Sequence, residues 1–203
     1  MNVLRTIFPC FRPCWDCIEG PSFGNDVYAK YTPYYQPTVR LDVTRMGKDV
    51  VILKEGERIC GTGGCLATVP IVQNKAFFQV TIQQNGIWGF GLGHKQTPLE
   101  NVPLKEKFWG IRDNGDVVAE DNVIGKITKP IEDGDTIGVT YDHVELKFYI
   151  NDVDCGLCIT GIRGPIYPII YVDESAILDI KFKNFTASVP PGFGEILVEQ
   201  TLL

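Results

Sequence analysis

The sequence predicts an all-β fold, a sandwich of antiparallel sheets with very little helix. Three observations support this prediction. Apolar and polar residues alternate in several short segments, and side chains alternate between the two faces of a strand. Pairs such as Asn85-Gly86 and Asn114-Gly115 favour tight turns between these segments. The 21 glycines recur at short intervals, which is typical of many short strands rather than of helices.

The clearest hairpin spans residues 134–151, with its turn at Asp142-His143. Both of its strands alternate with a period of two, so each should bury one face and expose the other. We expect the buried face to comprise Ile137, Val139 and Tyr141 of the first strand and Val144, Leu146, Phe148 and Ile150 of the second.

Further strands follow from the same kinds of pattern. The apolar run Val50–Leu53 suits a buried strand within residues 48–54. Residues 75–83 alternate, which predicts that Phe78, Val80 and Ile82 lie inside and that Phe77, Gln79 and Thr81 lie on the other face. Short turns near residues 99–105 and 196–202 are the only candidates for helix. Other strands are expected at residues 86–92, 108–112, 166–172 and 177–183.

Residues 1–37 differ in composition from residues 38–203. They hold five of the 13 prolines and three of the seven cysteines. Because proline blocks both helices and central strands, we expect a partly irregular N-terminal arm followed by one domain with a C-terminal extension. No run of 18 apolar residues predicts a membrane span, and Pro9 and Pro13 interrupt the apolar stretch that a signal peptide needs. We therefore expect a cytoplasmic protein with reduced thiols.

The cysteines of the arm, Cys10, Cys14 and Cys17, leave three interpretations open. A structural zinc site needs four ligands, and no fourth ligand lies near them in the sequence. Reversible S-acylation suits clustered cysteines beside apolar residues such as Phe8 and Trp15, and two acyl chains would anchor the chain at a membrane. In the third interpretation the thiols have no function.

Residues that carry catalysis are few and poorly spaced. The histidines, His94 and His143, fall after a glycine-rich stretch and in a turn, and no G-x-S-x-G elbow surrounds a serine. The series Gly89-x-Gly91-x-Gly93 lacks the following helix that a phosphate cradle needs, so we expect these glycines to relieve crowding where strands bend. The acidic pairs lack the spacing of a calcium loop. The sequence predicts no enzyme, no cofactor and no metal site, although folding could still join a cysteine to a histidine.

Three blocks of this sequence resemble the SPRY domain family. Residues 76–92 resemble its aromatic–E–V strand and the W-x-V/I-G strand that follows, and residues 134–151 resemble its G-D-x-I-G-V…L-x-F-x-x-N-G hairpin. Residues 166–170 resemble its L-Y-P-x-F strand. The resemblance covers residues 38–185 and implies a bent sandwich of two antiparallel sheets, similar to a concanavalin-type jelly roll. It also implies a non-enzymatic module that binds partner proteins through loops at one rim of the sandwich.

This resemblance directs attention to three predicted loops that could meet at one rim. No loop matches the family's binding positions residue by residue, so we nominate residues by their expected exposure and chemistry. The third loop is acidic, which favours a partner segment with Lys or Arg. The nominated residues are Lys54, Glu55 and Arg58 in the first loop, Leu99 and Glu100 in the connection 96–107, and Asp173, Glu174 and Ser175 in the third loop.

We therefore expect a monomeric module that docks a protein or peptide partner. The net charge of −6 and the lack of a Lys/Arg run argue against a nucleic-acid partner. One alternative is a scaffold tethered to a membrane by its S-acylated arm. Another is a small-ligand binder or enzyme of sandwich fold, which a pocket joining His94 or His143 to a cysteine would favour.

Overall fold

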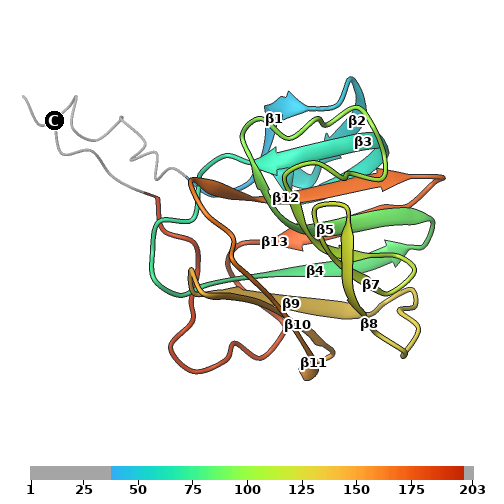
Figure 1. The fold of residues 1–203 in the computed structure, drawn as a ribbon. Helices are drawn as coiled ribbons and strands as arrows, with labels where there is room; N and C mark the ends of the chain where they lie inside the picture. Colours follow the sequence, from blue (N-terminus) through green and yellow to red (C-terminus); the bar gives the residue numbers. More distant parts are fainter. Residues whose placement is uncertain (1–37, 199–203) are drawn as a thin grey trace, which may run out of the picture. The chain divides into compact units, whose positions relative to one another are not determined.

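The computed structural model describes residues 38–198, and residues 1–37 and 199–203 lie outside this description. Within residues 38–198 the chain forms 13 strands and one short 3₁₀ helix, η2 (Lys54–Gly56) (Figure 1). No helix in this range is long and apolar enough to cross a bilayer. The strands are β1 (Leu41–Met46), β2 (Asp49–Leu53), β3 (Arg58–Ala67), β4 (Ala76–Gln84), β5 (Ile87–His94), β6 (Phe108–Arg112), β7 (Asp116–Ala119), β8 (Asn122–Lys126), β9 (Thr136–Tyr141), β10 (Glu145–Ile150), β11 (Val153–Thr160), β12 (Ile166–Asp173) and β13 (Ile177–Lys181).

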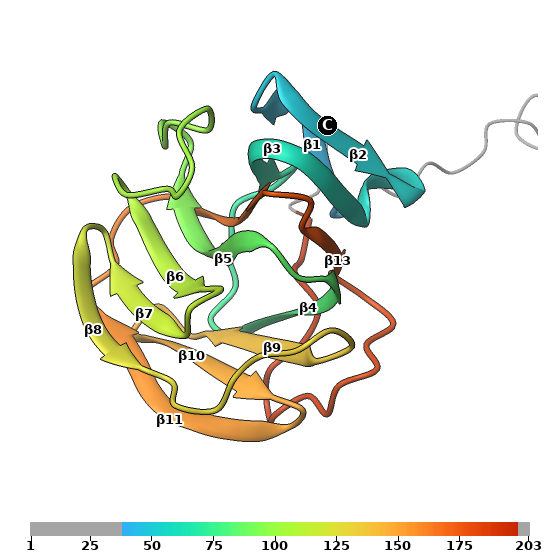
Figure 2. The same cartoon turned by 90° about the vertical axis from the view of Figure 1, so that its right-hand side faces the viewer.

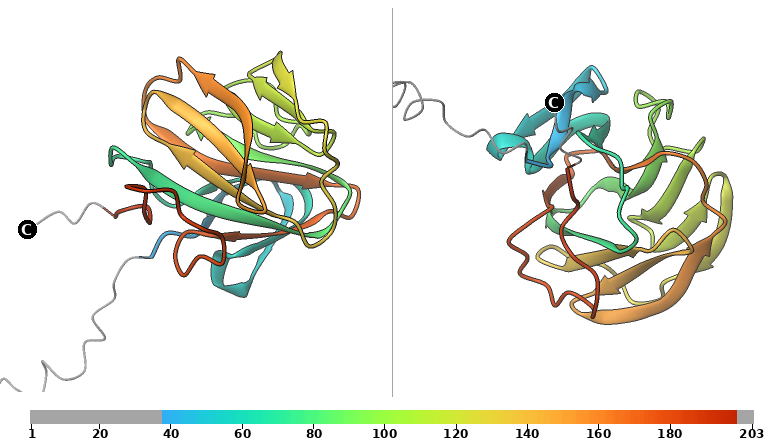
Figure 3. Two further views of the ribbon diagram at one scale, coloured as in Figure 1. Left: turned by 90° about the horizontal axis from the view of Figure 1, so that it is seen from below. Right: turned by 90° about the vertical axis from the view of Figure 1, so that its left-hand side faces the viewer.

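Two antiparallel sheets pack against each other and share strand β3 (Figures 2 and 3). Sheet A has the strand order β1-β3-β12-β5-β6-β7-β8. Sheet B has the order β2-β3-β13-β4-β9-β10-β11. Because β3 belongs to both, the hydrogen-bonded strands form one continuous path. This architecture confirms the predicted sandwich of antiparallel sheets.

Glycines allow β3 to pass from one sheet to the other. Its first half pairs with β2 and β13, and its second half pairs with β12 and β1. Gly61 and Gly63 have φ angles of 93° and 127°, in a region that strongly favours glycine. A Cβ atom at Gly61 would also collide with the main-chain oxygen of Asp49. The bend in β3 therefore depends on the absence of a side chain at this position.

The main core fills the space between the two sheets. The rings of Trp88 and Phe90 stack with their centroids 5.5 Å apart, and Phe148 has no exposed surface. Six of the seven inward placements expected in the hairpin 134–151 are confirmed, because Ile137, Val139, Tyr141, Leu146, Phe148 and Ile150 are all buried.

Val144 is the seventh of these residues, and its predicted inward placement was wrong. Its side chain is 66% exposed, and β10 begins only at Glu145. The carboxylate of Asp142 accepts hydrogen bonds from the N–H groups of Val144 and Glu145, so the turn extends through Val144. An aspartate that binds the backbone two or three residues ahead forms a turn that alternation alone does not reveal.

The expectation of a buried strand at Val50–Leu53 was also wrong. β2 is an edge strand of sheet B, and its residues alternate: Val50 is buried, whereas Val51 and Leu53 are 49% and 48% exposed. No helix forms at residues 99–105 or 196–198, and the 3₁₀ turn η2 was not predicted.

The outer face of β4 is buried at Phe77 and Gln79, contrary to the prediction, whereas Thr81 is half-buried and Gln83 is exposed. The C-terminal strap, defined here as residues 183–198, crosses this face. Phe185 meets the Phe77 ring edge-on, with centroids 4.7 Å apart. The Gln79 amide donates to the Thr186 hydroxyl at 2.8 Å and accepts the N–H groups of Thr186 and Ala187 at 2.8 and 3.0 Å. A distant segment thus converts a solvent face into an interior one.

Candidate functional site

The nominated residues fall where three connections leave the sheets. Lys54 and Glu55 belong to η2, and Arg58 is the first residue of β3 rather than a loop residue. Leu99 and Glu100 lie in the connection between β5 and β6, and Asp173 ends β12. Glu174 and Ser175 form the turn into β13, where both have positive φ angles.

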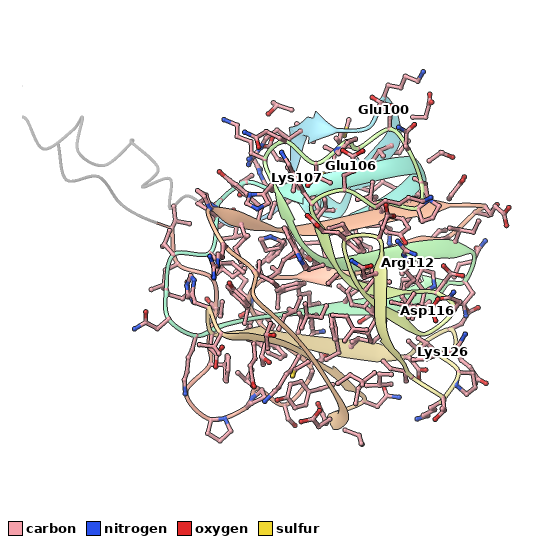
Figure 4. All side chains as sticks on the ribbon, in the orientation of Figure 1. Glu100, Glu106, Lys107, Arg112, Asp116 and Lys126 are labelled. Atoms are coloured by element: carbon pink, nitrogen blue, oxygen red, sulfur yellow. The ribbon has the colours of Figure 1, made fainter. Side chains whose placement is uncertain are left out.

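The second and third of these connections meet at the turn between β1 and β2. The Glu100 carboxylate accepts the N–H of Lys48, with both oxygens at 3.3 Å. The next residue, Asp49, pairs with Thr62 of β3, and the Thr62 hydroxyl donates to Asp173 at 2.9 Å. Glu100 lies at the outer surface of the domain, near β1 and β2 (Figure 4). We call Asp49, Glu100, Asp173 and Glu174 the acidic rim.

The first connection does not join the acidic rim. Lys54 lies five residues beyond Asp49 at the far end of β2, a distance of about 16 Å along a strand. Lys54 and Arg58 bind Asp179 of β13, with N···O distances of 2.9 Å each. Burial alone would raise the pKa of the Asp179 carboxyl, but hydrogen bonds from Arg58 and Lys54 outweigh it and lower the pKa. Lys54 and Arg58 therefore neutralise a carboxylate of the same domain, that of Asp179.

A cluster of glycines places the loop that carries Glu100. The main-chain oxygen of Leu99 accepts the N–H of Gly64 at 2.7 Å. A Cβ atom at Gly47 would lie 2.9 Å from the same oxygen, and one at Gly63 would lie 3.1 Å from it. Sequence analysis missed Asp49 and these glycines, although the run Gly61-Thr62-Gly63-Gly64 is a visible signal of close backbone approach.

Residues 96–107, the covering loop, lie over the outer face of sheet A. Beneath the loop is a second core, separate from the one between the sheets. Tyr171 and Phe108 meet there with ring centroids 5.5 Å apart. The residues of the second core are Leu66, Leu104, Phe108, Val118, Ile169 and Tyr171.

The glycines of β5 provide the floor of this second core. A side chain at Gly89 would collide with the ring of Tyr171, and one at Gly93 would lie 2.9 Å from Ile169. A side chain at Gly91 would collide with the main chain of Trp109. The glycines do relieve crowding, but at Gly89 and Gly93 the crowding comes from side chains on the outer face of sheet A, and at Gly91 it comes from the main chain of the neighbouring strand β6.

The structure shows no catalytic arrangement of histidine and cysteine among residues 38–198. The His94 ring packs against the Trp109 ring with centroids 5.3 Å apart, and the Nε2 atom of His143 lies 3.0 Å from the main-chain oxygen of Gln73. Burial raises the pKa of the Cys65 thiol to about 12, which disfavours a reactive thiolate. Four surface hollows of about 290 to 530 Å³ contain neither residue type in their linings. No group of three potential metal ligands gathers in this part of the chain.

The lipidation candidates Cys10, Cys14 and Cys17 lie outside the described residues.

Comparison with known proteins identifies the family. A family model of the SPRY domain matches residues 75–185. The chain is 42% identical over 203 residues to SPRY domain-containing protein 7 of Gallus gallus, covering 97% of this chain and 98% of that protein. It is 45% identical over 170 residues to the Homo sapiens protein of the same name, covering 82% of this chain and 87% of that protein.

Solved structures agree in fold. The SPRY domain of human HERC1 superposes with a TM-score of 0.59 at 14% identity, covering 69% of this chain and 96% of that chain. The stonustoxin structure superposes with a TM-score of 0.56 at 12% identity, covering 71% of this chain and 27% of that one. With the family model and the two relatives, these likenesses lead to one conclusion: the chain belongs to the SPRY domain family.

Proposed function

We propose that this protein is a docking module that holds a partner protein through the acidic rim. SPRY domains are commonly protein-interaction modules. The observation that carries the proposal is the convergence of three connections: the β1–β2 turn, the β5–β6 connection and the β12–β13 turn. Glu100 accepts the N–H of Lys48 in the β1–β2 turn. The next residue, Asp49, pairs with Thr62, whose hydroxyl donates to Asp173. Binding residues are often found on loops that a rigid scaffold positions.

The negative charge of the acidic rim favours a partner segment of positive charge. Asp49, Glu100 and Glu174 are exposed and Asp173 is half-buried, so four carboxylates share one surface with Lys48 as the adjacent cation. A partner segment with Lys or Arg would complement this charge. Because exposed charges are screened by salt, the partner's association rate should fall as ionic strength rises.

The test uses a displayed library of random peptides and the full chain. Selection should enrich peptides with Lys or Arg, and Asp173→Lys with Glu174→Lys should abolish their capture. The neutral pair Asp173→Asn with Glu174→Gln should weaken it less, because the Thr62 hydroxyl can still donate to the side-chain amide oxygen introduced at position 173. Reversal of the exposed acidic pair Glu120 and Asp121 on the β7–β8 turn is the matched control. Enrichment without basic residues, or equal loss in the control, would contradict the proposal.

A second role is compatible with docking and is favoured by the sequence of the arm. S-acylation of Cys10, Cys14 and Cys17 would hold the module at a membrane surface while the acidic rim engages its partner. Hydroxylamine-sensitive acyl labelling of the full chain, lost when all three cysteines are changed to Ala, would support this role. Absence of labelling in the unchanged chain would exclude it without affecting the docking proposal.

A further inference from the structure

Leu104 occupies the second core in the manner of a bound ligand. Its side chain is 1% exposed and packs among Leu66, Phe108, Ile169 and Tyr171, above the glycine floor of β5. Its main-chain oxygen accepts a hydrogen bond from the Nη2 atom of Arg112 at 3.0 Å. Arg112 comes from β6, on the outer side of sheet A (Figure 4).

This occupant leaves two buried donors without partners. Among residues 38–198, neither the Nε atom of Arg112 nor the hydroxyl of Tyr171 has a hydrogen-bond acceptor. No carboxylate in the same range lies within ion-pair distance of Arg112. Burial raises the pKa of the Tyr171 hydroxyl despite the nearby Arg112 cation, so this group stays protonated and remains a donor. A buried donor without a partner destabilises the state that contains it.

The segment around Leu104 is weakly attached. Residues 100–106 make no backbone–backbone hydrogen bond within the described part of the chain, and their one main-chain hydrogen bond there is the one that the Leu104 oxygen accepts from Arg112. Firm bonds flank the segment, at the Leu99 oxygen and where the Thr97 hydroxyl donates to the Lys107 oxygen at 2.9 Å. Hollows of about 350 and 290 Å³ lie along it. Few hydrogen bonds and loose packing are properties of segments that open locally.

We propose that the second core is a binding site for the C-terminal residue of a partner chain, an aliphatic residue whose free carboxylate replaces the Leu104 carbonyl. A carboxylate has two oxygens and can pair with the Nε and Nη2 atoms of Arg112 together, whereas a carbonyl pairs with one. The same oxygens can accept the Tyr171 hydroxyl. Leu104 is thus an internal competitor that keeps the site closed until a partner arrives. The acidic rim shares the covering loop with this site through Glu100, but Asp173 and Glu174 lie outside the second core, so reversal of these two residues should leave the site intact.

The first test measures binding of a short peptide ending in Ala-Leu, with a free carboxylate or with a C-terminal amide, to the full chain. Leu104→Ala removes the competitor, so the free-carboxylate peptide should bind about tenfold more tightly than it binds the unchanged protein. The amide peptide should bind weakly to both. Leu53→Ala, a change at an exposed leucine of β2, is the control and should change neither affinity. Equal binding of the two peptides to the Leu104→Ala variant would overturn the proposal.

A second variant decides the question even if Leu104→Ala folds poorly. Tyr171→Phe removes a buried hydroxyl that has no hydrogen-bond partner among residues 38–198, so the melting temperature should stay constant or rise. The free-carboxylate peptide should nevertheless bind about fivefold more weakly, because one donor to its carboxylate is lost. A purely structural hydroxyl would give the opposite pattern: a lower melting temperature and unchanged peptide affinity. That result would overturn the proposal.

Discussion

The two outer faces of this sandwich are covered in different ways. The covering loop lies on sheet A through apolar packing, and Leu104 makes the one main-chain hydrogen bond of residues 100–106 within residues 38–198. The C-terminal strap lies on sheet B through hydrogen bonds to two glutamines: Gln79 binds Thr186 and Ala187, and Gln73 binds the main chain of Glu195 and Leu197. Beneath the covering loop, the Arg112 Nε atom and the Tyr171 hydroxyl have no acceptor among residues 38–198, whereas beneath the strap the buried Gln79 amide makes three hydrogen bonds.

This difference teaches that burial alone does not distinguish a fixed cover from a displaceable one. Apolar contacts are non-directional, so a partner's side chain can replace them. Three hydrogen bonds to one buried glutamine require a matching set of donors and acceptors, which a partner is less able to supply. The covering loop is therefore the better candidate for a binding element, and the strap for a structural one.

The largest expected effect is at the core that lies under both covers. Phe148→Ala should reduce the free energy of unfolding by about 3–5 kcal/mol, because it deletes a fully buried ring between the sheets. Urea denaturation measures this loss. Hydrogen exchange should quicken in the covering loop and in the strap alike, since the two sheets that carry these covers both pack on this main core. A loss below about 1 kcal/mol would contradict the central position of Phe148.

Leu104→Ala should separate the two covers. We expect a loss of about 2–3 kcal/mol, near the lower end for a buried leucine, because the covering loop can collapse into the space. Hydrogen exchange should increase in residues 96–107 and stay constant in the strap. Leu53→Ala, at an exposed leucine, should cost less than about 0.5 kcal/mol. Faster exchange in the strap would show that the two covers are coupled.

Gln79→Ala should have the reverse effect on the covers. It removes three hydrogen bonds to the strap and should cost about 1–3 kcal/mol. Trypsin should then cleave the chain faster at Lys183, at the start of the strap, while residues 96–107 keep their exchange rates. Gln83→Ala, at an exposed position of the same strand, is the matched control. Unchanged cleavage would mean that the contact between Phe77 and Phe185 suffices to hold the strap.

The smallest expected effect concerns the outer face of sheet B beside β2. The pKa of Asp179 is lowered in the folded state, so its ion pairs with Arg58 and Lys54 stabilise the fold above the unfolded-state pKa of about 3.9. That stability should be lost as the pH falls through the lower, folded-state pKa. Urea melts at a series of pH values should therefore show a shallower acid dependence for Arg58→Gln than for the unchanged protein. Parallel curves would show that the pair contributes little.

Much of the fold could be predicted from local patterns, and the failures share one cause. Alternation correctly placed Phe148 because β10 buries one face and leaves the other half-buried. It also placed Ile137 correctly, although the other face of β9 is buried as well, at Thr140. It failed at Gln79 because a segment about 107 residues away covers that face. The separate prediction of a buried strand from the apolar run Val50–Leu53 failed at Val51, because such a run does not reveal whether its strand lies at the edge of a sheet.

The candidate site could be predicted in part. Glu100 and Asp173 were nominated as acidic residues of separate loops, and the structure brings both to the β1–β2 turn. Lys54 and Arg58 were nominated from the same reasoning, but they bind Asp179 instead, because charge in a sequence does not show which charges are already paired. Asp49 was missed because nothing in its local sequence distinguishes it from the other acidic residues of turns.

By itself, the sequence determined the class of fold and the family, because period-two alternation, hairpin turns and three ordered motifs are local or follow chain order. Only the tertiary structure decided what lies over each sheet and which loops meet. Those features depend on contacts between residues far apart in the chain, such as Thr62 with Asp173 and Arg112 with Leu104 beside Tyr171. Packing selects such contacts from many that the sequence would equally allow, so they appear only once the whole domain has folded.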